Sequence, residues 1–413
     1  MASLQIRPIL AALRHHRGAT ALIVLQIALT LGIVCNALFI IQQRLEHIAR
    51  PTGIDEANIA VIHNQWIGKY TTAQMDAMTL SDLAALQRLP GVADAYDDYT
   101  YPAVGPMAQL SSVRYTRDQP KKTSYAEPYY ADDHALSTLG LRLIAGRNFR
   151  ADEIMVVGDA DTQMPPVIII TSDLAERLFP RQTVVGRVVY LGDTPSTIIG
   201  VIAHLQVPAI GTHSFAYCAV LLPRRNANFF NNGSYYIVRA QPGQLDAVIR
   251  AAPRALLKLN RMRVLDEAGG MQRYSDLREI GYLRDRGMTL LLSMICAVLL
   301  AATVGGVVGL SSFWVSQRQK QIGIRRALGA TRSDILRYFQ AENFLIVSFG
   351  VVLGMVLAFA LSITLMKYYE LPRLPLYYLP IGALLLWLLG QLAVLGPALR
   401  AAAVPPVVAT RSV

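Results

Sequence analysis

The stretch "RQKQIGIRRALGATRSDILRYFQAEN", from Arg318 to Asn343, decides how this chain is interpreted. It places six arginine or lysine residues and only two acidic ones between long segments that carry no charge. Four windows of at least 24 residues lack Asp, Glu, Lys and Arg, and two of them flank this stretch: 18–43, 287–317, 343–366 and 374–399. About 20 helical residues cross the ~30 Å hydrocarbon core of a bilayer. All four windows are therefore predicted to span a membrane.

The composition favours spans combined with a water-facing domain. Of the 413 residues, 53% are hydrophobic and 16% are charged, with a mean hydropathy of +0.35. These values lie between those of soluble proteins and pure membrane bundles. A cleaved signal peptide is an alternative for the first window. However, its apolar run exceeds the ~7–15 residues of a signal-peptide core and ends in Gln42-Gln43-Arg44, so we predict a retained anchor.

The net charge of +11 is distributed unevenly along the chain. The termini and the stretch 318–343 together hold 11 basic and two acidic residues, whereas 44–286 holds 26 basic and 25 acidic residues. The positive-inside rule assigns the basic segments to the cytoplasm. Both termini are therefore expected inside and 44–286 outside. The basic excess is explained by topology and does not predict nucleic-acid binding.

The predicted fold is a membrane protein with four transmembrane α-helices and a large α+β domain inserted between the first and second spans. The expected segments are a cytoplasmic N-terminus (1–18), the first span (19–42), the outside domain (43–286), the second span (287–314), a cytoplasmic loop (315–342), the third span (343–366), a short outside loop (367–375), the fourth span (376–399) and a cytoplasmic tail (400–413).

The outside domain is expected to be a split βαβ unit, about 55–109 and 226–270, with a β-rich insert at about 110–225. The first part shows a strand at 57–65, a helix at 81–89 that Ser81 caps, and a strand at 90–99. The second part repeats this order with strands at 234–240 and 261–265 around a helix at 245–259, for which Pro253 predicts a break. In the insert, 184–203 predicts a hairpin with a Gly192-Asp193 turn.

Motifs for catalysis are missing from the sequence. It contains no G-x-x-x-x-G-K-[ST], H-E-x-x-H, C-x-x-C or G-x-S-x-G pattern, so we expect no ATPase site, catalytic residue or metal site of its own. "ADDHALS" (131–137) is interpreted as a solvated turn, and Asp97-Asp98 as a surface pair. The tyrosines of the outside domain are expected in its core and at interfaces, and an aromatic groove is the alternative. The spans hold no charged residue at mid-depth, which argues against a proton or ion relay.

Two G-x-x-x-G pairs lie in the predicted spans and indicate close helix contacts: Gly305 with Gly309, and Gly350 with Gly354. Glycine is common in spans, so each pair alone is weak evidence. Helical spacing of apolar residues in 274–292 predicts one continuous helix running into the second span. The first span is expected to continue likewise through 40–50, until Pro51 ends it.

The order of segments and the loop sequence resemble the FtsX-like permeases of the MacB type, a class of ABC transporter also called type VII. The family's loop reads close to E-R-x-x-E-I-G-I-x-R-A-x-G-A, and here it reads "QRQKQIGIRRALGA". Segments 139–149 and 184–203 resemble the family's periplasmic core domain. The corresponding loop positions are Gln317, Arg318, Gln321, Ile322, Gly323, Ile324, Arg325, Arg326, Ala327, Leu328, Gly329 and Ala330. Gln317 and Gln321 replace the family's two glutamates and keep hydrogen-bonding capacity without the charge.

The resemblance implies a permease that transmits ATP-driven movement to its periplasmic domain. The loop would be a coupling helix on a separate ABC-type ATPase, with Ile322, Ile324, Ala327 and Leu328 filling a cleft and Arg325 and Arg326 reaching polar groups around it. ATP and Mg²⁺ would sit on that ATPase, and this chain would bind no cofactor. A role of the arginines only in topology and lipid contact is the alternative. Gly329 is expected to end the helix, and Thr331 with Asp334 to cap the next.

The implied setting is the bacterial inner membrane, with the large domain in the periplasm. Expected partners are a second permease copy or a related permease, membrane lipid and, in an export complex, a periplasmic adaptor and an outer-membrane duct. The implied cargo is an antibiotic, a peptide or a similar compound. Two alternatives stay open at this point: a scaffold that activates a cell-wall hydrolase, and extraction of lipoproteins from the inner membrane.

Overall fold

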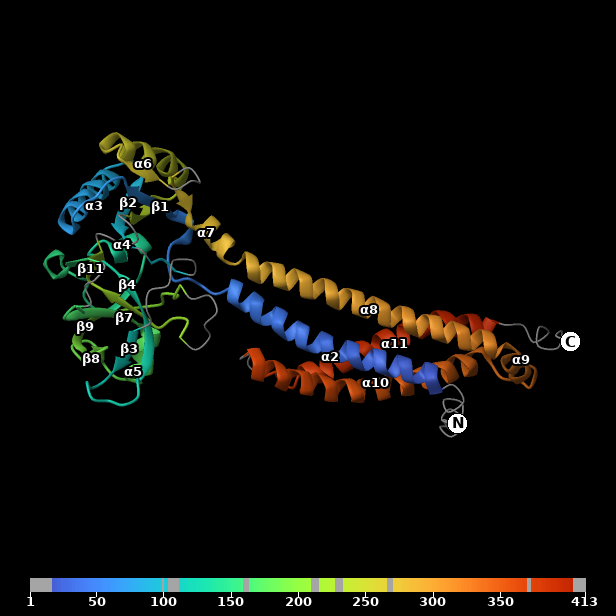
Figure 1. Cartoon of the computed structure of the whole chain (residues 1–413). Coiled ribbons are helices and arrows are strands. Elements are labelled where there is room, and N and C mark those ends of the chain that lie inside the picture. The colour runs from blue at the N-terminus through green and yellow to red at the C-terminus, as the bar shows by residue number, and fades with distance from the viewer. Residues whose placement is uncertain are drawn as a thin grey trace. The chain divides into compact units, whose positions relative to one another are not determined.

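The computed structural model describes residues 17–98, 100–102, 111–158, 163–208, 215–226, 233–265, 270–369 and 373–403. The chain forms two compact units, which are coloured along the chain in Figure 1. Met1–Ile48 and Arg284–Val413 make the membrane unit, and Ala49–Leu283 makes the water-facing unit. Most of the expected N-terminal segment (1–16) and most of the expected tail (404–413) lie outside the described residues.

Four helices of the membrane unit are long and apolar enough to cross a bilayer. They are α2 (Arg17–Ile48), α8 (Leu283–Gln317), α10 (Arg332–Tyr369) and α11 (Tyr378–Ala403). Four spans with a large domain between the first and second confirm the predicted fold class. The helices extend beyond the uncharged windows because polar residues at their ends also adopt helical structure.

Helix α10 shows how such an extension begins. The Thr331 amide donates to Asp334 Oδ2 at 3.0 Å, and the Asp334 amide donates to Thr331 Oγ1 at 3.2 Å. This reciprocal cap satisfies amides that have no partner within the helix. The expected cap is confirmed, and the helix starts 11 residues before the predicted third span. The short helix α9 (Gln319–Ala327) connects α8 to α10.

Helix α2 lies at the centre of the bundle, and α8 lies at its edge. In the most apolar 18-residue window of α2, 61% of the residues are buried, whereas in that of α8 the share is 17%. Ile27 and Leu31 of α2 belong to the same buried cluster as Val347 and Val351 of α10. Helices α2, α10 and α11 therefore form the packed part of the unit, and α8 runs beside them (Figure 1).

The first sheet of the water-facing unit has the order β13-β1-β12-β2, with β14 also paired to β1. Its pairs are antiparallel, and Val61 of β1 lies opposite Ile237 of β12. Helices α3 (Thr72–Gln87) and α6 (Leu245–Leu259) pack on it, with Leu86 and Leu256 in its core. The strands are β1 (Ile59–Trp66), β2 (Val92–Asp97), β12 (Gly233–Ala240), β13 (Arg263–Leu265) and β14 (Gln272–Arg273).

The second sheet is mixed and has seven strands in the order β5-β9-β7-β10-β4-β3-β8. Strands β8 and β9 are antiparallel and joined at Gly192, which has a φ of +62° that favours glycine. This confirms the predicted hairpin. The strands are β3 (Ser111–Arg114), β4 (Ser124–Tyr130), β5 (Leu143–Gly146), β7 (Val167–Thr171), β8 (Val188–Leu191), β9 (Thr194–Ile202) and β10 (Ala219–Leu222).

Four shorter elements accompany this second sheet. Helices α4 (Ala135–Leu139) and α5 (Ser172–Leu178) lie between its strands in sequence, with buried residues in both. Strands β6 (Met155–Val157) and β11 (Arg224–Asn226) form a separate parallel pair. Strand β11 and the residues just before helix α4 belong to the candidate site described below.

Two helix predictions in this unit are wrong. Helix α3 starts at Thr72, well before Ser81, because the Thr71 side chain and Gln74 form a capping box. Ser81 lies inside the helix. Helix α6 continues through Pro253, since the buried face that includes Val248, Ala252 and Leu256 holds the helix against the sheet.

The predicted continuous helix over 274–292 is also wrong. Helix α7 (Tyr274–Gly281) ends before Tyr282, which has φ −93° and ψ 4°, and α8 begins at Leu283. The ring of Tyr282 is buried, Gln206 donates to its hydroxyl at 3.0 Å, and the Arg278 guanidinium lies 5.7 Å from its centroid. These contacts hold Tyr282 within the water-facing unit and interrupt the helix. The expected extension of the first span occurs, since α2 continues to Ile48.

Candidate functional site

Helix α9 is fastened to the bundle by a buried ion pair at its start. Arg318 Nη1 lies 3.0 Å from a carboxylate oxygen of Glu342 on α10, and the side chains are 14% and 2% exposed. Removing one partner of such a pair leaves an uncompensated buried charge, which costs about 3–5 kcal/mol. Arg318 therefore positions α9 and is largely unavailable to a partner protein.

The inner face of α9 packs against the bundle. Ile322 and Gly323 are buried, and Ile322 joins an apolar cluster with Ile335 and Phe339 of α10 and with Ala398 and Ala401 of α11. The expectation that Ile322 fills a cleft in another protein is therefore wrong. The physical reason is that α10 and α11 already enclose this side chain.

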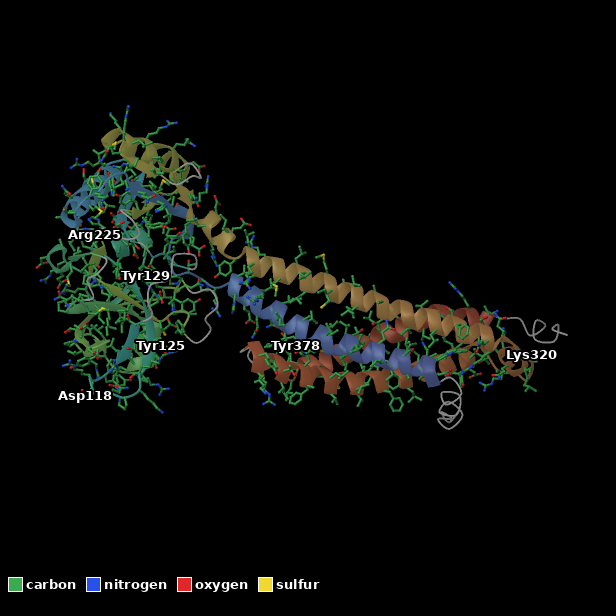
Figure 2. The ribbon with its side chains drawn as sticks, viewed as in Figure 1. Asp118, Tyr125, Tyr129, Arg225, Lys320 and Tyr378 are labelled. Atoms are coloured by element: carbon green, nitrogen blue, oxygen red, sulfur yellow. The ribbon has the colours of Figure 1, made fainter. Side chains whose placement is uncertain are left out.

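The outer face of α9 presents apolar side chains to solvent. Ile324 is 48% exposed and Leu328 is 84% exposed, and they are four residues apart, so they lie on one side of the helix. Gln317, Gln321 and Ala327 are exposed as well. Figure 2 labels Lys320 on this same helix at the end of the bundle. We call Lys320, Gln321, Ile324 and Leu328 the α9 surface.

The two arginines at the end of α9 have contacts within the chain. Arg326 donates from Nη1 to the Ala402 carbonyl of α11 at 3.2 Å. The Arg325 guanidinium lies 5.0 Å from the ring centroid of Tyr338 on α10, within cation–π range. Arg326 therefore also orients the end of α9, whereas the exposed Arg325 remains accessible beside the α9 surface.

Gly329 ends α9 as expected. Its φ is +100°, a region that residues with a Cβ rarely adopt, and its amide donates to the Arg326 carbonyl at 3.1 Å. The Ala330 amide donates to the Arg325 carbonyl at 3.0 Å. These bonds satisfy the last carbonyls of the helix and turn the chain into the cap of α10.

The two G-x-x-x-G pairs have different environments. A Cβ built on Gly350 would lie 2.7 Å from Ile27 Cβ, and one built on Gly354 would lie 2.8 Å from Leu31 Cβ. Glycine at both positions lets α10 approach α2 closely. A Cβ on Gly305 or Gly309 of α8 would meet nothing within 4 Å among the described residues. Of these two pairs, the one on α10 therefore marks a helix contact among the described residues.

The water-facing unit contains a second polar site that the sequence did not reveal. Arg225 of β11 forms an ion pair with Asp76 of α3 at 2.5 Å, and His134 Nδ1 lies 2.8 Å from Asp94 Oδ1 of β2. Both pairs join the first sheet and its helix to the insert. We call this contact the carboxylate seam; Figure 2 labels Arg225 within it. It also includes Asp97, Asp98 and Asp132.

The seam carboxylates are buried, so the predicted surface pair Asp97-Asp98 and solvated turn at Asp132 are wrong. The three residues are 7%, 2% and 5% exposed. These carboxylates are buried because the neighbouring sheet covers the strands that carry or precede them. The Thr100 amide donates to Asp98 Oδ1 and the His134 amide to Asp132 Oδ1, both at 2.9 Å, so part of the carboxylates' hydrogen-bonding need is met.

Burial raises the pKa of all three seam carboxyls. For Asp97, burial and then the nearby Asp132 charge raise the pKa well above its usual range. Burial raises the pKa of Asp98 well above its usual range, and that of Asp132 to about 6, although the His134 charge acts in the opposite direction on Asp132. Burial lowers the pKa of His134, but the Asp94 and Asp132 carboxylates outweigh it and raise the pKa above its usual value.

The seam is therefore a site for protons and ion pairs. Among the described residues, no group of three or more His, Cys, Asp or Glu side chains is placed to hold a metal ion. Its charged pairs are separated by 40 residues for His134–Asp94 and by 149 for Arg225–Asp76. Sequence alone offers no signal for such pairs. The feature of the sequence that comes nearest to indicating this site is the run of acidic residues in "ADDHALS".

Two family models match this chain and together span most of it. The MacB-like periplasmic core domain matches residues 20–255, and the FtsX-like permease C-terminal domain matches 293–406. The chain belongs to the MacB-type FtsX-like permeases of ABC transporters. The loop with α9 lies within the second match, and the carboxylate seam lies within the first.

The curated relatives of this MacB-type chain are larger proteins. The macrolide export ATP-binding/permease protein MacB of Shewanella sp. strain ANA-3 is 26% identical over 363 residues, which cover 86% of this chain and 52% of that protein. The probable syringafactin export ATP-binding/permease protein SyfD of Pseudomonas syringae pv. syringae B728a is 25% identical, covering 85% and 51%. The chain thus spans about half the length of these relatives.

Two of the solved structures that resemble the chain are domains from outside the membrane. The periplasmic region of MacB from Actinobacillus actinomycetemcomitans has a TM-score of 0.34 and 13% identity, and covers 56% of this chain and 96% of that one. The extracellular domain of the noncanonic ABC-type transporter YknZ from Gram-positive bacteria has a TM-score of 0.31 and 15% identity, covering 50% and 100%.

Proposed function

We propose that this chain is the permease part of an ABC-type exporter, and that the α9 surface is where an ABC-type ATPase transmits movement to it. The arrangement of α9 is the observation that carries the proposal. Ile322 fixes the helix on α10 and α11, while Ile324 and Leu328 stay exposed on the opposite side. A solvent-exposed apolar pair on a rigidly held helix is typical of a protein interface.

The coupling follows from how α9 is held. The ion pair from Arg318 to Glu342 and the hydrogen bond from Arg326 to Ala402 attach α9 to α10 and α11. A force on Leu328 would therefore be passed to two spans together. In this proposal Arg325 and Lys320 contact acidic or carbonyl groups of the ATPase, and ATP and Mg²⁺ are held by the ATPase. Gln317 and Gln321, both exposed, would contribute hydrogen bonds where the family has carboxylates.

The proposed orientation places α9 and both termini in the cytoplasm and Ala49–Leu283 in the periplasm of a bacterial inner membrane. The excess of arginine and lysine around α9 supports this orientation. The permease would act as a dimer with a second copy or a related permease. The names of the relatives, which refer to macrolide export and syringafactin export, support export of an antibiotic, a peptide or a similar compound by this chain. An adaptor and an outer-membrane duct are proposed as further partners.

The test changes one exposed residue of the α9 surface. The full chain is reconstituted in nanodiscs with its ABC-type ATPase, and binding and ATP turnover are measured. Leu328→Asp is expected to weaken ATPase binding at least about tenfold, the factor given by 1.4 kcal/mol. Leu376→Asp, a 62% exposed leucine next to the start of α11, is the matched control and should leave binding unchanged.

Two results would contradict the proposal. Equal binding and turnover with Leu328→Asp and wild type would mean that the ATPase does not bind at the α9 surface. Substantial ATP turnover by the separately purified residues 1–413 would show that the described fold itself carries an ATPase site.

A further inference from the structure

A groove runs between α8 and α11 near the end of the membrane unit that carries α9. It has a volume of about 370 Å³. Apolar side chains of both helices line most of it, among them Val304, Val308 and Leu392. Ser312 and Arg400 line it where α8 and α11 approach their C-terminal ends. The groove is therefore apolar along its length and polar at one end.

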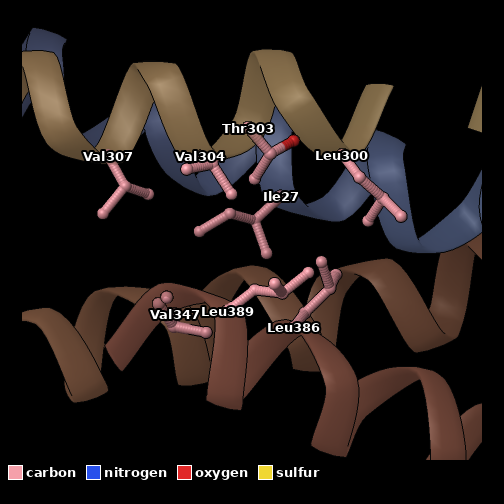
Figure 3. Close-up of a pocket in the computed structure, with 9 residues that line it drawn as sticks. Ile27, Leu300, Thr303, Val304, Val307, Val347, Leu386 and Leu389 are labelled. Carbon is pink, nitrogen blue, oxygen red and sulfur yellow. The ribbon is translucent and has the colours of Figure 1, made fainter. Parts of the chain in front are cut away.

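The groove continues toward the centre of the bundle. A smaller void of about 10 Å³ shares Val304 and Leu389 with the groove and reaches Ile27 of α2. Figure 3 shows side chains of α8 directed across this void toward Leu386 and Leu389. From Leu300 in the void to Ser312 in the groove, α8 rises roughly 18 Å, at 1.5 Å per residue. The void has room for no more than a water molecule, so the groove itself, from Val304 to Ser312 on α8, is the part whose elongated apolar shape accepts a hydrocarbon chain.

The groove is open because α8 packs lightly and α11 has a small residue beside it. Gly396 lines the groove, and a Cβ built on it would meet nothing within 4 Å among the described residues. The most apolar segment of α8 is only 17% buried. A space of this kind, open to the side within a membrane, is filled by lipid or by another helix.

The polar end of the groove distinguishes between these two occupants. Arg400 is exposed, and among the described residues it has no ion-pair partner. Two other cations at this end of the bundle are held within the chain, since Arg318 is paired with Glu342 and Arg326 donates to the Ala402 carbonyl. An apolar helix would fill the groove but leave Arg400 without a counter-ion. A phosphate attached to an acyl chain satisfies both parts of the site.

We propose that the α8–α11 groove binds one anionic phospholipid, with an acyl chain between Val304 and Leu392 and the phosphate on Arg400 and Ser312. Basic pockets between helices on the cytoplasmic side of a membrane bind phospholipid headgroups by the same chemistry. The proposal relies on the cytoplasmic placement of α9 given above. It does not require that α9 couples to an ATPase, because lipid binding is measured without ATP or a partner.

The experiment counts lipids retained by the full chain in native mass spectrometry. The protein is titrated in detergent with dioleoyl-phosphatidylglycerol or dioleoyl-phosphatidylcholine. Wild type is expected to retain one phosphatidylglycerol. Arg400→Gln should weaken its binding about tenfold, which corresponds to 1.4 kcal/mol, and leave phosphatidylcholine binding unchanged. Arg332→Gln removes a charge at the same end of the bundle without changing the groove, and should keep the wild-type affinity within about twofold.

A second pair of variants separates the acyl chain from the headgroup. Val308→Trp fills the groove and is expected to abolish retention of the phosphatidylglycerol. Val298→Trp places the same side chain at a 67% exposed position of α8 that does not line the groove, and should have no effect. A photo-reactive residue at Val308 should cross-link to phosphatidylglycerol.

The proposal is overturned by any of three results. Equal retention of phosphatidylglycerol and phosphatidylcholine by wild type would show a groove that ignores the headgroup. Displacement of the lipid by millimolar inorganic phosphate would show a site for a free anion. Cross-linking from Val308 to a second copy of the chain, with no lipid adduct, would show that a helix fills the groove.

Discussion

Two contacts in this protein join segments that are far apart in the sequence, and they use opposite chemistry. Helices α2 and α10 meet through Gly350 and Gly354, which bring Ile27 and Leu31 into close apolar contact. The carboxylate seam joins the first sheet to the insert through ion pairs and buried carboxyls, including Arg225–Asp76 and Asp132. The first contact depends on shape and the second on charge and protonation.

The two contacts are expected to respond to different changes. An apolar contact built on glycine has no titratable group, so its strength is independent of pH and sensitive to added volume. A seam of buried carboxyls is sensitive to pH, because ionising each one costs desolvation energy. We therefore expect the membrane unit to respond to side-chain size and the water-facing unit to respond to pH.

The largest expected effect comes from adding volume at the apolar contact. In Gly350→Leu, the new Cβ would lie 2.7 Å from Ile27 Cβ and 3.2 Å from the Val24 carbonyl oxygen. Because backbone atoms of α2 must move, the free energy of unfolding should fall by about 3 kcal/mol. Thermal unfolding of the full chain in detergent, followed by helical circular dichroism, measures this loss.

Gly305→Leu is the matched control, since it has the same gain in helix propensity but meets nothing within 4 Å among the described residues. Its free energy of unfolding should stay within about 0.5 kcal/mol of wild type. Equal losses in the two variants would mean that the environments of the two glycine pairs do not differ as described.

A pH series on Asp132→Asn sharpens the other side of the comparison. The pKa of Asp132 is raised to about 6 in the folded state, from 3.8 in an unfolded chain. Below about pH 3 the carboxyl is mostly protonated in both states. Between pH 4 and 6 it ionises in the unfolded chain first, so wild type should lose on the order of 2 kcal/mol relative to Asp132→Asn as the pH rises to 7.

Urea unfolding followed by Trp66 fluorescence reports this change, in a background with Trp314 and Trp387 replaced by phenylalanine. Trp66 lies in the water-facing unit, and the chain has three tryptophans in total. Gly350→Leu provides the contrasting case, because its loss should be the same at pH 4.5 and pH 7. A stability difference between Asp132→Asn and wild type that does not change with pH would contradict the assigned role of this carboxyl.

A smaller loss is expected from the ion pair of the seam. Arg225→Met keeps the unbranched apolar stem of the side chain but removes its hydrogen bonds to Asp76, and should cost about 1.5 kcal/mol at pH 7. The Arg225 charge also lowers the pKa of Asp97 and Asp132 in the folded protein. In the variant both pKa values should rise, so the loss of stability with increasing pH should extend to higher pH. Arg187→Met, at an exposed arginine of the insert, should leave the pH profile unchanged.

The smallest expected effect concerns a neutral polar contact within the membrane unit. Thr30 of α2 and Thr303 of α8 share a hydrogen bond of 2.8 Å. Thr303→Val should cost roughly 0.6 kcal/mol, with no pH dependence, because membrane hydrogen bonds of this type contribute little. Thr364→Val, whose hydroxyl bonds only to its own helix at Ala360, should cost less. A loss above 2 kcal/mol in Thr303→Val would mean that α8 depends on this bond far more than its light packing suggests.

Local features of the fold were predictable from the sequence, and the errors there have identifiable causes. The reciprocal cap of Thr331 and Asp334 and the turn at Gly192 depend on residues at most four positions apart. The start of α3 follows the capping pattern of Thr71 with Gln74, and Ser81, the predicted cap, lies inside the helix. The break at Tyr282 could not be predicted, since it depends on Gln206, 76 residues away.

The sequence by itself determined the four spans, the position of the large domain between the first two, and the helix end at Gly329. Hydrophobic length, charge and turn chemistry act within a few residues, so they can be read along the chain. Only the tertiary structure decided that Ile322 is buried while Ile324 is exposed, that Gly350 meets Ile27 while Gly305 meets no described neighbour, and that Asp97 lies inside a seam. These outcomes depend on which distant segment covers each side chain, and that is a property of the packed chain as a whole.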